Sequence, residues 1–198
     1  MPSPPYCIPL HLGQALVQTA RRTLLERFGL ELETAEGKSL DALLKHPVLQ
    51  VKAGTFVTLK IGGRLRGCIG SLVGHECVIQ SVKTNAVNAA FHDPRFPPLR
   101  EQELADVRIE VSVLTPAQPL HYENPEELTA KLRPHVDGVI LRKGYCSATF
   151  LPQVWEQLTQ PENFLSHLCM KAGLGAGAWR SSRLDVEIYQ VQCFEEPV

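Results

Sequence analysis

Apolar side chains along the chain follow two different spacings, one helical and one strand-like. A spacing of four residues, which indicates a helix with one buried face, is kept by Leu12, Leu16, Ala20, Leu24 and Phe28. Gly29 is well placed to end that helix, because glycine readily takes the left-handed conformation found at helix C-termini. Residues 107–113 instead alternate strictly between aliphatic and polar side chains. That alternation predicts a half-buried strand.

The same order of elements is predicted twice. In the first half, a short helix over 39–45 ended by Pro47 is followed by a hairpin of strands 55–61 and 64–72 turning at Gly62-Gly63, a helix over 76–90 and the strand over 107–113. In the second half come a helix over 124–132, a hairpin of strands 138–142 and 145–151, helical stretches over 153–158 and 162–172, and a strand over 184–193. Hairpin, helix and strand thus recur. The pattern predicts an α+β fold with two pseudo-repeats around a mostly antiparallel, curved sheet with flanking helices.

Chain length and proline content suggest how the fold is divided. The 198 residues fit one domain or two small subdomains. Residues 1–9 hold four prolines and read as an extended arm. We expect one domain over 10–198, made of two intertwined subdomains over about 10–120 and 121–198.

Composition excludes several classes of function. With 20 basic and 21 acidic residues, the chain has no overall field that would attract nucleic acid or anionic lipid. No apolar run approaches the roughly 20 residues that a membrane-spanning helix needs. The N-terminus lacks the basic and apolar regions of a secretory signal. We therefore expect a cytoplasmic protein without a membrane partner.

Neither a metal nor a cofactor is predicted. The six cysteines include no C-x-x-C pair, and the seven histidines are scattered, so the cysteines read as free thiols in a reducing compartment. The segment GLGAGA at 173–178 superficially resembles a dinucleotide fingerprint. It follows a predicted helix rather than a strand, and we expect no helix after it.

The stretch GGRLRGCIG at 62–70 is the strongest candidate for a site. Arg66 and Cys68 point to one face of their strand, because side chains alternate. With a two-residue turn, that face also carries Val57 and Leu59. A guanidinium beside a thiol favours the thiolate, which is the reactive form. An arginine on a partly apolar face needs an anionic partner, and the candidates are Asp93, Glu110 and Glu76.

The glycines of this stretch leave two interpretations open. Gly67 and Gly70 provide room for a ligand, or for another backbone, to approach closely. Alternatively, Cys68 is a core residue in a strand relieved by glycines, and Arg66 belongs to a structural ion pair.

A proline-rich loop and a helix end supply further candidates. The loop DPRFPP at 93–98 combines Asp93, Arg95 and Phe96 just past a predicted helix end. These residues either line a binding site or form a self-contained Asp–Arg turn that Phe96 plugs. Lys171 is a more distant candidate, although it could simply complement the dipole of its helix.

These motifs together resemble the AMMECR domain family, whose bacterial and archaeal members are called AmmeMemoRadiSam system protein A. The resemblance rests on LRGCIG at 65–70, on DPRFPP at 93–98, on VSVLTP at 111–116, and on shorter matches at 137–138, 143–144, 151–154 and 171–174. It implies a compact α+β fold with two pseudo-repeats around one curved sheet. It also implies partnership with a Memo-type protein and a radical S-adenosylmethionine enzyme, but it supplies no reaction.

Three functions are consistent with these observations. The leading hypothesis is a cytoplasmic enzyme, or a catalytic accessory, in which Cys68 is the nucleophile or redox thiol. Arg66 would activate the thiol or hold an anionic group, and the loop with Asp93 and Arg95 would wall the pocket. The alternative is a non-catalytic binding module for the pathway partners. Nucleic-acid binding ranks last, and it would use Arg21, Arg22, Lys60, Arg64 and Phe96.

Overall fold

The computed structural model describes residues 7–30 and 34–196, and its chain divides into two compact units. The first unit comprises Met1–Thr115 together with Gln192–Val198, and the second comprises Pro116–Val191. The end of the chain thus returns to the first unit. Each unit has its own four-stranded sheet and its own hydrophobic core.

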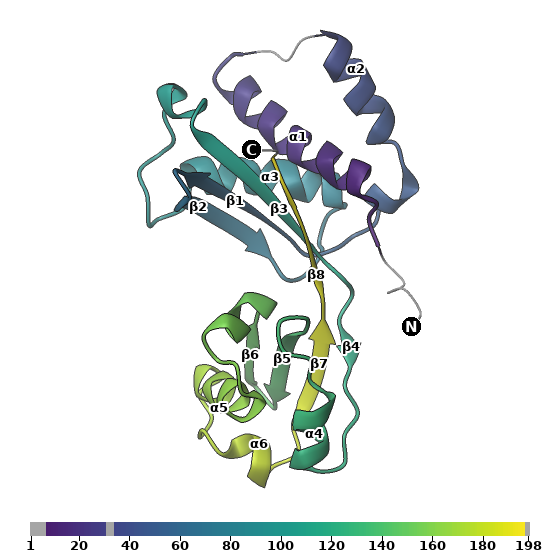
Figure 1. Cartoon of the computed structure of the whole chain (residues 1–198), viewed down its shortest axis with the longest axis vertical. Coiled ribbons are helices and arrows are strands. Elements are labelled where there is room, and N and C mark those ends of the chain that lie inside the picture. Colours follow the sequence, from purple (N-terminus) through teal and green to yellow (C-terminus); the bar gives the residue numbers. More distant parts are fainter. Residues whose placement is uncertain (1–6, 31–33, 197–198) are drawn as a thin grey trace. The chain divides into compact units, whose positions relative to one another are not determined.

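The first unit places helices on one face of its sheet. Its strands occur in the order β2-β1-β3-β8, and β1 pairs antiparallel with both β2 and β3. Helices α1 and α3 pack on each other and on these strands (Figure 1). The elements are α1 (Leu10–Arg27), α2 (Thr34–Leu43), η1 (Pro47–Leu49), β1 (Thr55–Ile61), β2 (Arg64–Ser71), α3 (Val78–Phe91), η2 (Glu101–Glu103), β3 (Val107–Leu114) and β8 (Val191–Glu195).

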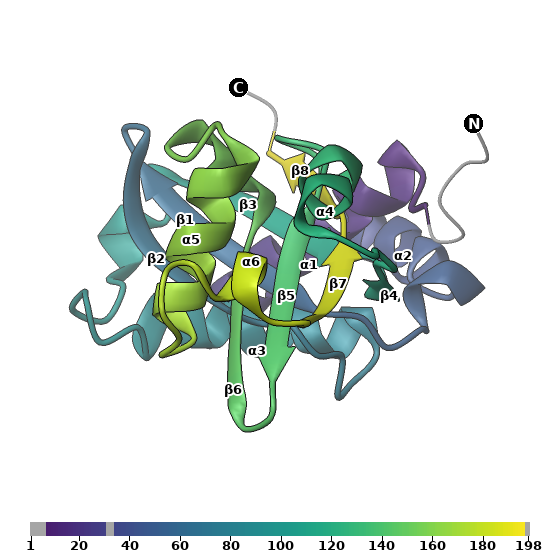
Figure 2. The same cartoon turned by 90° about the horizontal axis from the view of Figure 1, so that it is seen from below.

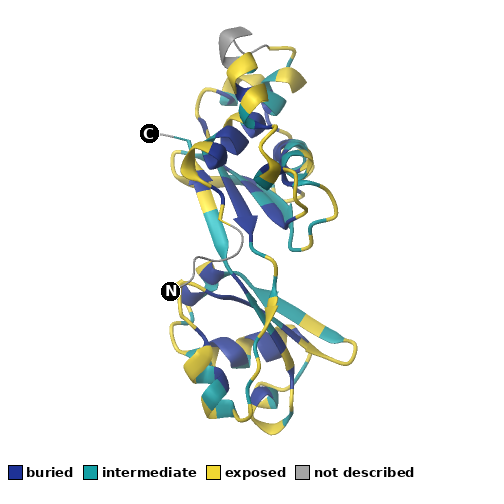
Figure 3. Ribbon diagram, turned by 90° about the vertical axis from the view of Figure 1, so that its right-hand side faces the viewer, coloured by how far each residue is buried: buried dark blue, intermediate teal, exposed yellow. Residues whose placement is uncertain are grey.

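The core of the first unit follows the two spacings seen in the sequence. The helix stripe of Leu12, Leu16 and Leu24 is buried against the inward side chains of the strands, such as Val57 and Ile109. In Figure 3 the buried positions run along the inner sides of helices and strands, while the hairpin turns are exposed. Burying these apolar side chains supplies most of the free energy that orders the unit.

The second unit is built around its own hairpin. Its sheet has the order β4-β7-β5-β6, and α5 lies beside β6 (Figure 2). Trp155 stacks on Phe164 in its core, with ring centroids 3.7 Å apart. The elements are β4 (Gln118–Pro119), α4 (Pro125–Lys131), β5 (Gly138–Lys143), β6 (Cys146–Phe150), η3 (Pro152–Glu156), α5 (Pro161–Lys171), α6 (Ala178–Ser181) and β7 (Asp185–Tyr189).

The α+β prediction is confirmed, and most elements lie where the patterns placed them. Among the described residues the strands form two antiparallel four-stranded sheets with flanking helices. The single strand predicted over 184–193 is two strands, β7 and β8, which belong to different sheets. A short helix, α6, does begin after the GLGAGA segment, but the element before that segment is α5, so the context is still not that of a dinucleotide site. The predicted arm over 1–9 lies largely outside the described residues.

Candidate functional site around Cys68

A β-bulge sets which face of the first sheet carries Cys68. Gly62 and Gly63 both have positive φ, as a tight hairpin turn requires. The pairing between β1 and β2 then shifts by one residue at Leu59/Lys60. Cys68 therefore pairs with Thr58, and the prediction that it shares a face with Val57 and Leu59 is wrong. The bulge turns the thiol away from the helix-covered core.

Three atoms of Cys68 are held by other residues. Its backbone N–H donates to Asp93 Oδ2 at 2.9 Å, and its carbonyl accepts from Arg95 Nη2 at 3.0 Å. Its Sγ accepts from the Thr58 hydroxyl at 3.3 Å. Because β2 is an edge strand, the first two bonds satisfy backbone groups that would otherwise be unpaired. The thiol itself is half-buried.

Arg66 holds the proline-rich loop rather than the thiol. Its Nε and Nη2 donate to the two carboxylate oxygens of Glu103 at 2.8 and 3.1 Å. Further bonds run to the carbonyls of Pro97 and Pro98 at 2.9 and 3.3 Å. The hydrogen bond from Arg66 lowers the pKa of Glu103 to about 2. The predicted partners Asp93, Glu110 and Glu76 are therefore wrong, and the ion-pair alternative for Arg66 describes its contacts.

The arginine that approaches Cys68 is Arg95. Its backbone N–H and Nε donate to Asp93 Oδ1 at 3.1 and 2.9 Å, and its Nη2 donates to Oδ2 at 2.7 Å. Its pKa is raised, first by the hydrogen bond to Asp93 and also by the Cys68 side chain. The same hydrogen bond lowers the pKa of the buried Asp93 carboxyl, although desolvation opposes it. Arg95 also lies over the half-buried Phe96 ring, 5.6 Å from its centroid.

The two glycines make room for protein atoms. A Cβ at Gly67 would lie 2.1 Å from the Ala89 carbonyl oxygen, so glycine lets α3 approach β2 closely. At Gly70 an added Cβ would lie 2.3 Å from the Thr55 oxygen and 2.4 Å from the Phe56 ring. Both positions are explained by packing within the first unit.

Lys171 and most of the basic residues considered for nucleic acid have partners of their own. Lys171 belongs to the second unit, where its Nζ donates to the Thr149 carbonyl at 2.9 Å and lies over the Phe150 ring. Three of the residues considered for nucleic acid form ion pairs that neutralise their charge: Arg21–Glu196, Arg22–Asp41 and Lys60–Glu110. Arg64 is exposed. The nucleic-acid hypothesis thus loses three of its cations to ion pairs.

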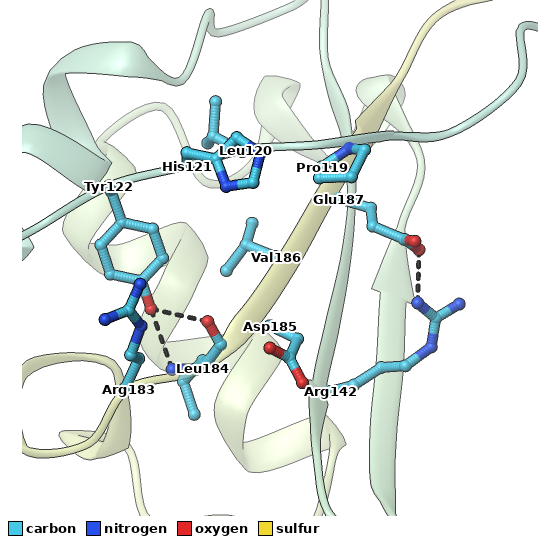
Figure 4. Close-up of a pocket in the computed structure, with 10 residues that line it drawn as sticks. All are labelled: Pro119, Leu120, His121, Tyr122, Arg142, Arg183, Leu184, Asp185, Val186 and Glu187. Carbon is cyan, nitrogen blue, oxygen red and sulfur yellow. Dashed lines mark hydrogen bonds and ion pairs between the residues drawn. The ribbon is translucent and has the colours of Figure 1, made fainter.

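A pocket in the second unit was not foreseen from the sequence. It encloses about 380 Å³ beside β7, where the chain leaves β4 (Figure 4). At one side of the pocket the Tyr122 hydroxyl accepts from Leu184 N and donates to Leu184 O, both at 2.9 Å (Figure 4). Arg142 and Glu187 pair at its edge. No motif marks these residues, since exposed polar side chains next to a strand are the usual pattern of a solvated face.

Two further features were sought among the described residues, a membrane-spanning helix and a cluster of metal-ligating side chains. No helix within 7–30 and 34–196 is long and apolar enough to cross a bilayer. Over the same residues, no group of three or more His, Cys, Asp or Glu side chains is arranged to hold a metal ion.

The architecture and the site define a two-unit α+β protein with a half-buried thiol fixed on an edge strand. The sequence profile of the AMMECR1 family matches residues 17–194, so the chain belongs to the AMMECR1 family. Protein MK0488 of Methanopyrus kandleri is 37% identical over 195 residues, covering 94% of this chain and 89% of that protein. Protein NEQ441 of Nanoarchaeum equitans is 42% identical over 150 residues, covering 75% and 83%.

A solved structure is similar over almost the whole chain. The crystal structure of the uncharacterized protein PH0010 from Pyrococcus horikoshii matches with a TM-score of 0.74 and 34% identity. The match covers 96% of this chain and 93% of the other. These comparisons show the family and the fold. The names of the similar proteins state no activity.

Proposed function

We propose that the protein is an enzyme, or a catalytic accessory, whose reacting group is the Cys68 thiol. The observation that carries this proposal is the combination of a half-buried sulfur with an unusually fixed residue: Asp93 and Arg95 hold its backbone and Thr58 donates to its Sγ. Positioning of this kind lowers the entropic cost of reaching a reactive geometry.

Each neighbour has a distinct role in this proposal. Arg95 is the cation held against Cys68, where its guanidinium can bind an anionic group of a substrate, a role that sequence reasoning gave to Arg66. Thr58 donates a hydrogen bond that a thiolate accepts better than a thiol does. Asp93 orients Arg95, and Arg66 fixes the loop that carries both residues. Arg66 and Asp93 are thus positioning residues.

The reaction proposed for Cys68 is nucleophilic. The thiolate attacks an electrophilic centre of a substrate, a bond from sulfur forms, and the leaving group departs with its electron pair. The proton of the thiol goes to solvent. We further propose, from the family resemblance, that this chemistry serves a cytoplasmic pathway with a Memo-type protein and a radical S-adenosylmethionine enzyme.

Site-resolved alkylation tests the proposal. Wild-type protein is treated with iodoacetamide at pH 7, and the rate at each cysteine is read by peptide mass spectrometry. Cys193 is the internal control, because it lies in the same unit and is more exposed than Cys68, so that access alone would favour Cys193. Desolvation raises the pKa of Cys193. We expect Cys68 to react at least about ten-fold faster than Cys193, and Thr58→Val to slow Cys68 alone. Equal rates, or a Cys68 that never reacts, would refute the nucleophile.

One observation favours a binding module as the second candidate. The ionic groups of the family motifs, on Arg66, Asp93 and Arg95, are already used within the chain. The bonds by which Asp93 and Arg95 hold the backbone of Cys68 form a clip on β2. A binding module would need this clip for the shape of its surface, and it would not need the Cys68 thiol. Cys68→Ala would then leave capture of a pathway partner unchanged, whereas under the first proposal it abolishes turnover.

A further inference from the structure

The pocket of the second unit is lined by two arginines and two carboxylates, and one of each is already paired. Its volume of about 380 Å³ lies within the range of about 300–1,000 Å³ that small-molecule sites have. Arg142 pairs with Glu187 at the edge of the pocket. Arg142 lies directly opposite Asp185 across β5 and β7, yet its ion pair is with Glu187. The charges left over for a ligand are therefore those of Arg183 and Asp185.

Arg183 and Asp185 carry opposite charges but do not pair with each other. They are exposed and are separated along the chain by the buried Leu184. Among the described residues, neither charged group has a hydrogen bond or an ion pair. Figure 4 shows the guanidinium on the Tyr122 side of the pocket and the carboxylate on the Arg142 side. The pocket thus presents one free donor group and one free acceptor group, held apart.

The backbone that carries these two groups is fixed from both sides of Leu184. The Tyr122 hydroxyl bonds to both Leu184 N and Leu184 O, and Leu120 N donates to the Val186 carbonyl at 2.8 Å. The side chains of Leu184 and Val186 are buried in the core of the second unit. In an extended chain the Cα atoms of residues two positions apart lie about 6–7 Å from each other. A fixed spacing of this kind lowers the ordering cost of binding a ligand to both groups.

Nearby charges outside the pocket are also partnered. Lys131, whose Nζ donates to the His121 carbonyl, pairs with Glu127. Arg180 lines the neighbouring pocket, where its guanidinium lies over the Trp179 ring, 4.3 Å from the centroid. The arginines and carboxylates that line the first pocket balance in number. Selection there depends on where the charges are placed rather than on an excess of one sign.

We propose that this pocket binds a small zwitterion, a free α-amino acid, whose carboxylate pairs with Arg183 and whose ammonium group pairs with Asp185. A guanidinium matches a carboxylate through two parallel hydrogen bonds, and an ammonium group donates readily to a carboxylate. A free amino acid carries its two charges close together, as the short spacing of the two residues requires. A peptide carries its charged termini at opposite ends. The ligand's side chain would lie against Pro119 and Leu120, which supply the apolar part of the lining.

A titration of the full chain followed by ¹H–¹⁵N NMR tests the proposal, and it does not involve Cys68. Each of the common amino acids is added separately at about 10 mM, which reveals even a Kd of about 1 mM. We expect at least one of them to shift the amide signals of Leu184 and Val186. The amino acid that binds most tightly is then compared with its N-acetyl derivative, which lacks the ammonium group, and with its amide, which lacks the carboxylate. Each derivative should bind at least about ten-fold more weakly, because one charged hydrogen-bonded contact is lost.

Two variants assign the two contacts. Arg183→Gln and Asp185→Asn should each weaken binding of the amino acid at least about ten-fold. Asp185→Asn should leave the affinity for the N-acetyl derivative unchanged, and Arg183→Gln should leave that for the amide unchanged, since each derivative already lacks the group concerned. Arg180→Gln is the matched control, because it removes a nearby exposed arginine that belongs to the neighbouring pocket. This control should bind like the wild type.

Three results would overturn the zwitterion site. The first is that no amino acid shifts the amide signals of Leu184 and Val186. The second is that both derivatives bind wild type as tightly as the amino acid does. The third is that Arg183→Gln and Asp185→Asn bind the amino acid as tightly as Arg180→Gln does. The dispersion of the NMR spectrum shows whether each variant is folded, and the comparison of derivatives in wild type decides the question if a variant is not.

Discussion

The hairpins β1–β2 and β5–β6 both end in an edge strand whose backbone groups need partners, but the residues that supply the partners differ. In each, a turn with positive-φ glycine leads into a strand at the edge of a sheet, β2 in the first unit and β6 in the second. In each, a cation from later in the chain donates to a carbonyl of that edge strand. Arg95 binds Cys68 O, and Lys171 binds Thr149 O.

The difference lies in what is added to this common arrangement. Of the two edge strands, β2 has a bulge in its pairing and β6 has none. In the first hairpin a buried carboxylate, Asp93, also accepts hydrogen bonds from Arg95 and from the Cys68 N–H. The Thr149 side chain is used for structure, since its hydroxyl donates to the Val139 carbonyl. A cation caps the edge strand in both hairpins, whereas the capped residue carries a thiol only in the first, since the capped residue of β6 is Thr149.

Removing the carboxylate of the first clip should have the largest effect. Asp93→Ala leaves Arg95 and the Cys68 N–H without their acceptor, and we expect the free energy of unfolding to fall by about 3 kcal/mol, because several hydrogen bonds to one buried carboxylate are lost. Urea unfolding at pH 7 measures it, with Asp106→Ala as an exposed control. A loss no larger than in the control would show that the clip does not stabilise the first unit.

The same variant should change the acid dependence of stability. The pKa of Asp93 is lowered on folding, so its contribution is present above the unfolded value of about 3.9 and is lost as pH falls below it. Stability of the wild type should therefore fall more steeply than that of Asp93→Ala between about pH 4 and 2. Parallel curves would contradict this assignment.

Substituting one glycine in each hairpin should have the next largest effect on stability, and the effect should differ between the two hairpins. Gly67→Ala brings a Cβ against the Ala89 carbonyl and should cost about 2–3 kcal/mol through displacement of α3. Gly144→Ala meets no neighbouring atom and should cost only about 1–2 kcal/mol, for its positive φ. Thermal unfolding of both variants measures the difference. The opposite ranking would mean that Gly67 is not needed for packing.

Loss of the second clip should have the smallest effect. Lys171→Met removes one exposed hydrogen bond to Thr149 O, which predicts a loss of about 0.5–1 kcal/mol. Urea unfolding of Lys171→Met, compared with urea unfolding of Asp93→Ala, measures this loss. A loss as large as that of Asp93→Ala would make the two clips equivalent and remove the distinction drawn between them.

Sequence reasoning recovered what depends on local periodicity. Helix α1 and strand β3 follow from side-chain spacing, because each element buries one face. The turn at Gly62-Gly63 follows from the conformational freedom of glycine. The division of the alternating segment 184–193 into β7 and β8 could not be predicted, since alternation is the same in either sheet.

The contacts around Cys68 follow from the sequence only in part, for a related reason. The structure brings Cys68, Asp93 and Arg95 together, as expected from their unusual residue types. Their roles depend on a one-residue bulge and on Glu103, which lies 37 positions from Arg66. Neither feature leaves a local signal, so the sequence places Arg66, rather than Arg95, beside Cys68. The ion pair between Lys60 and Glu110 was also missed, because partners on neighbouring strands can be identified only once the register is known.

The central claim is that Cys68, held in place by Arg95, is a reacting nucleophile, and one measurement tests it most directly. The rate of Cys68 alkylation by iodoacetamide at pH 7 is compared in wild type and in Arg95→Met, with Arg142→Met as the control in the second unit. The account predicts that Arg95→Met slows the alkylation of Cys68 at least about five-fold and that Arg142→Met leaves it unchanged. Equal rates in all three proteins would contradict it.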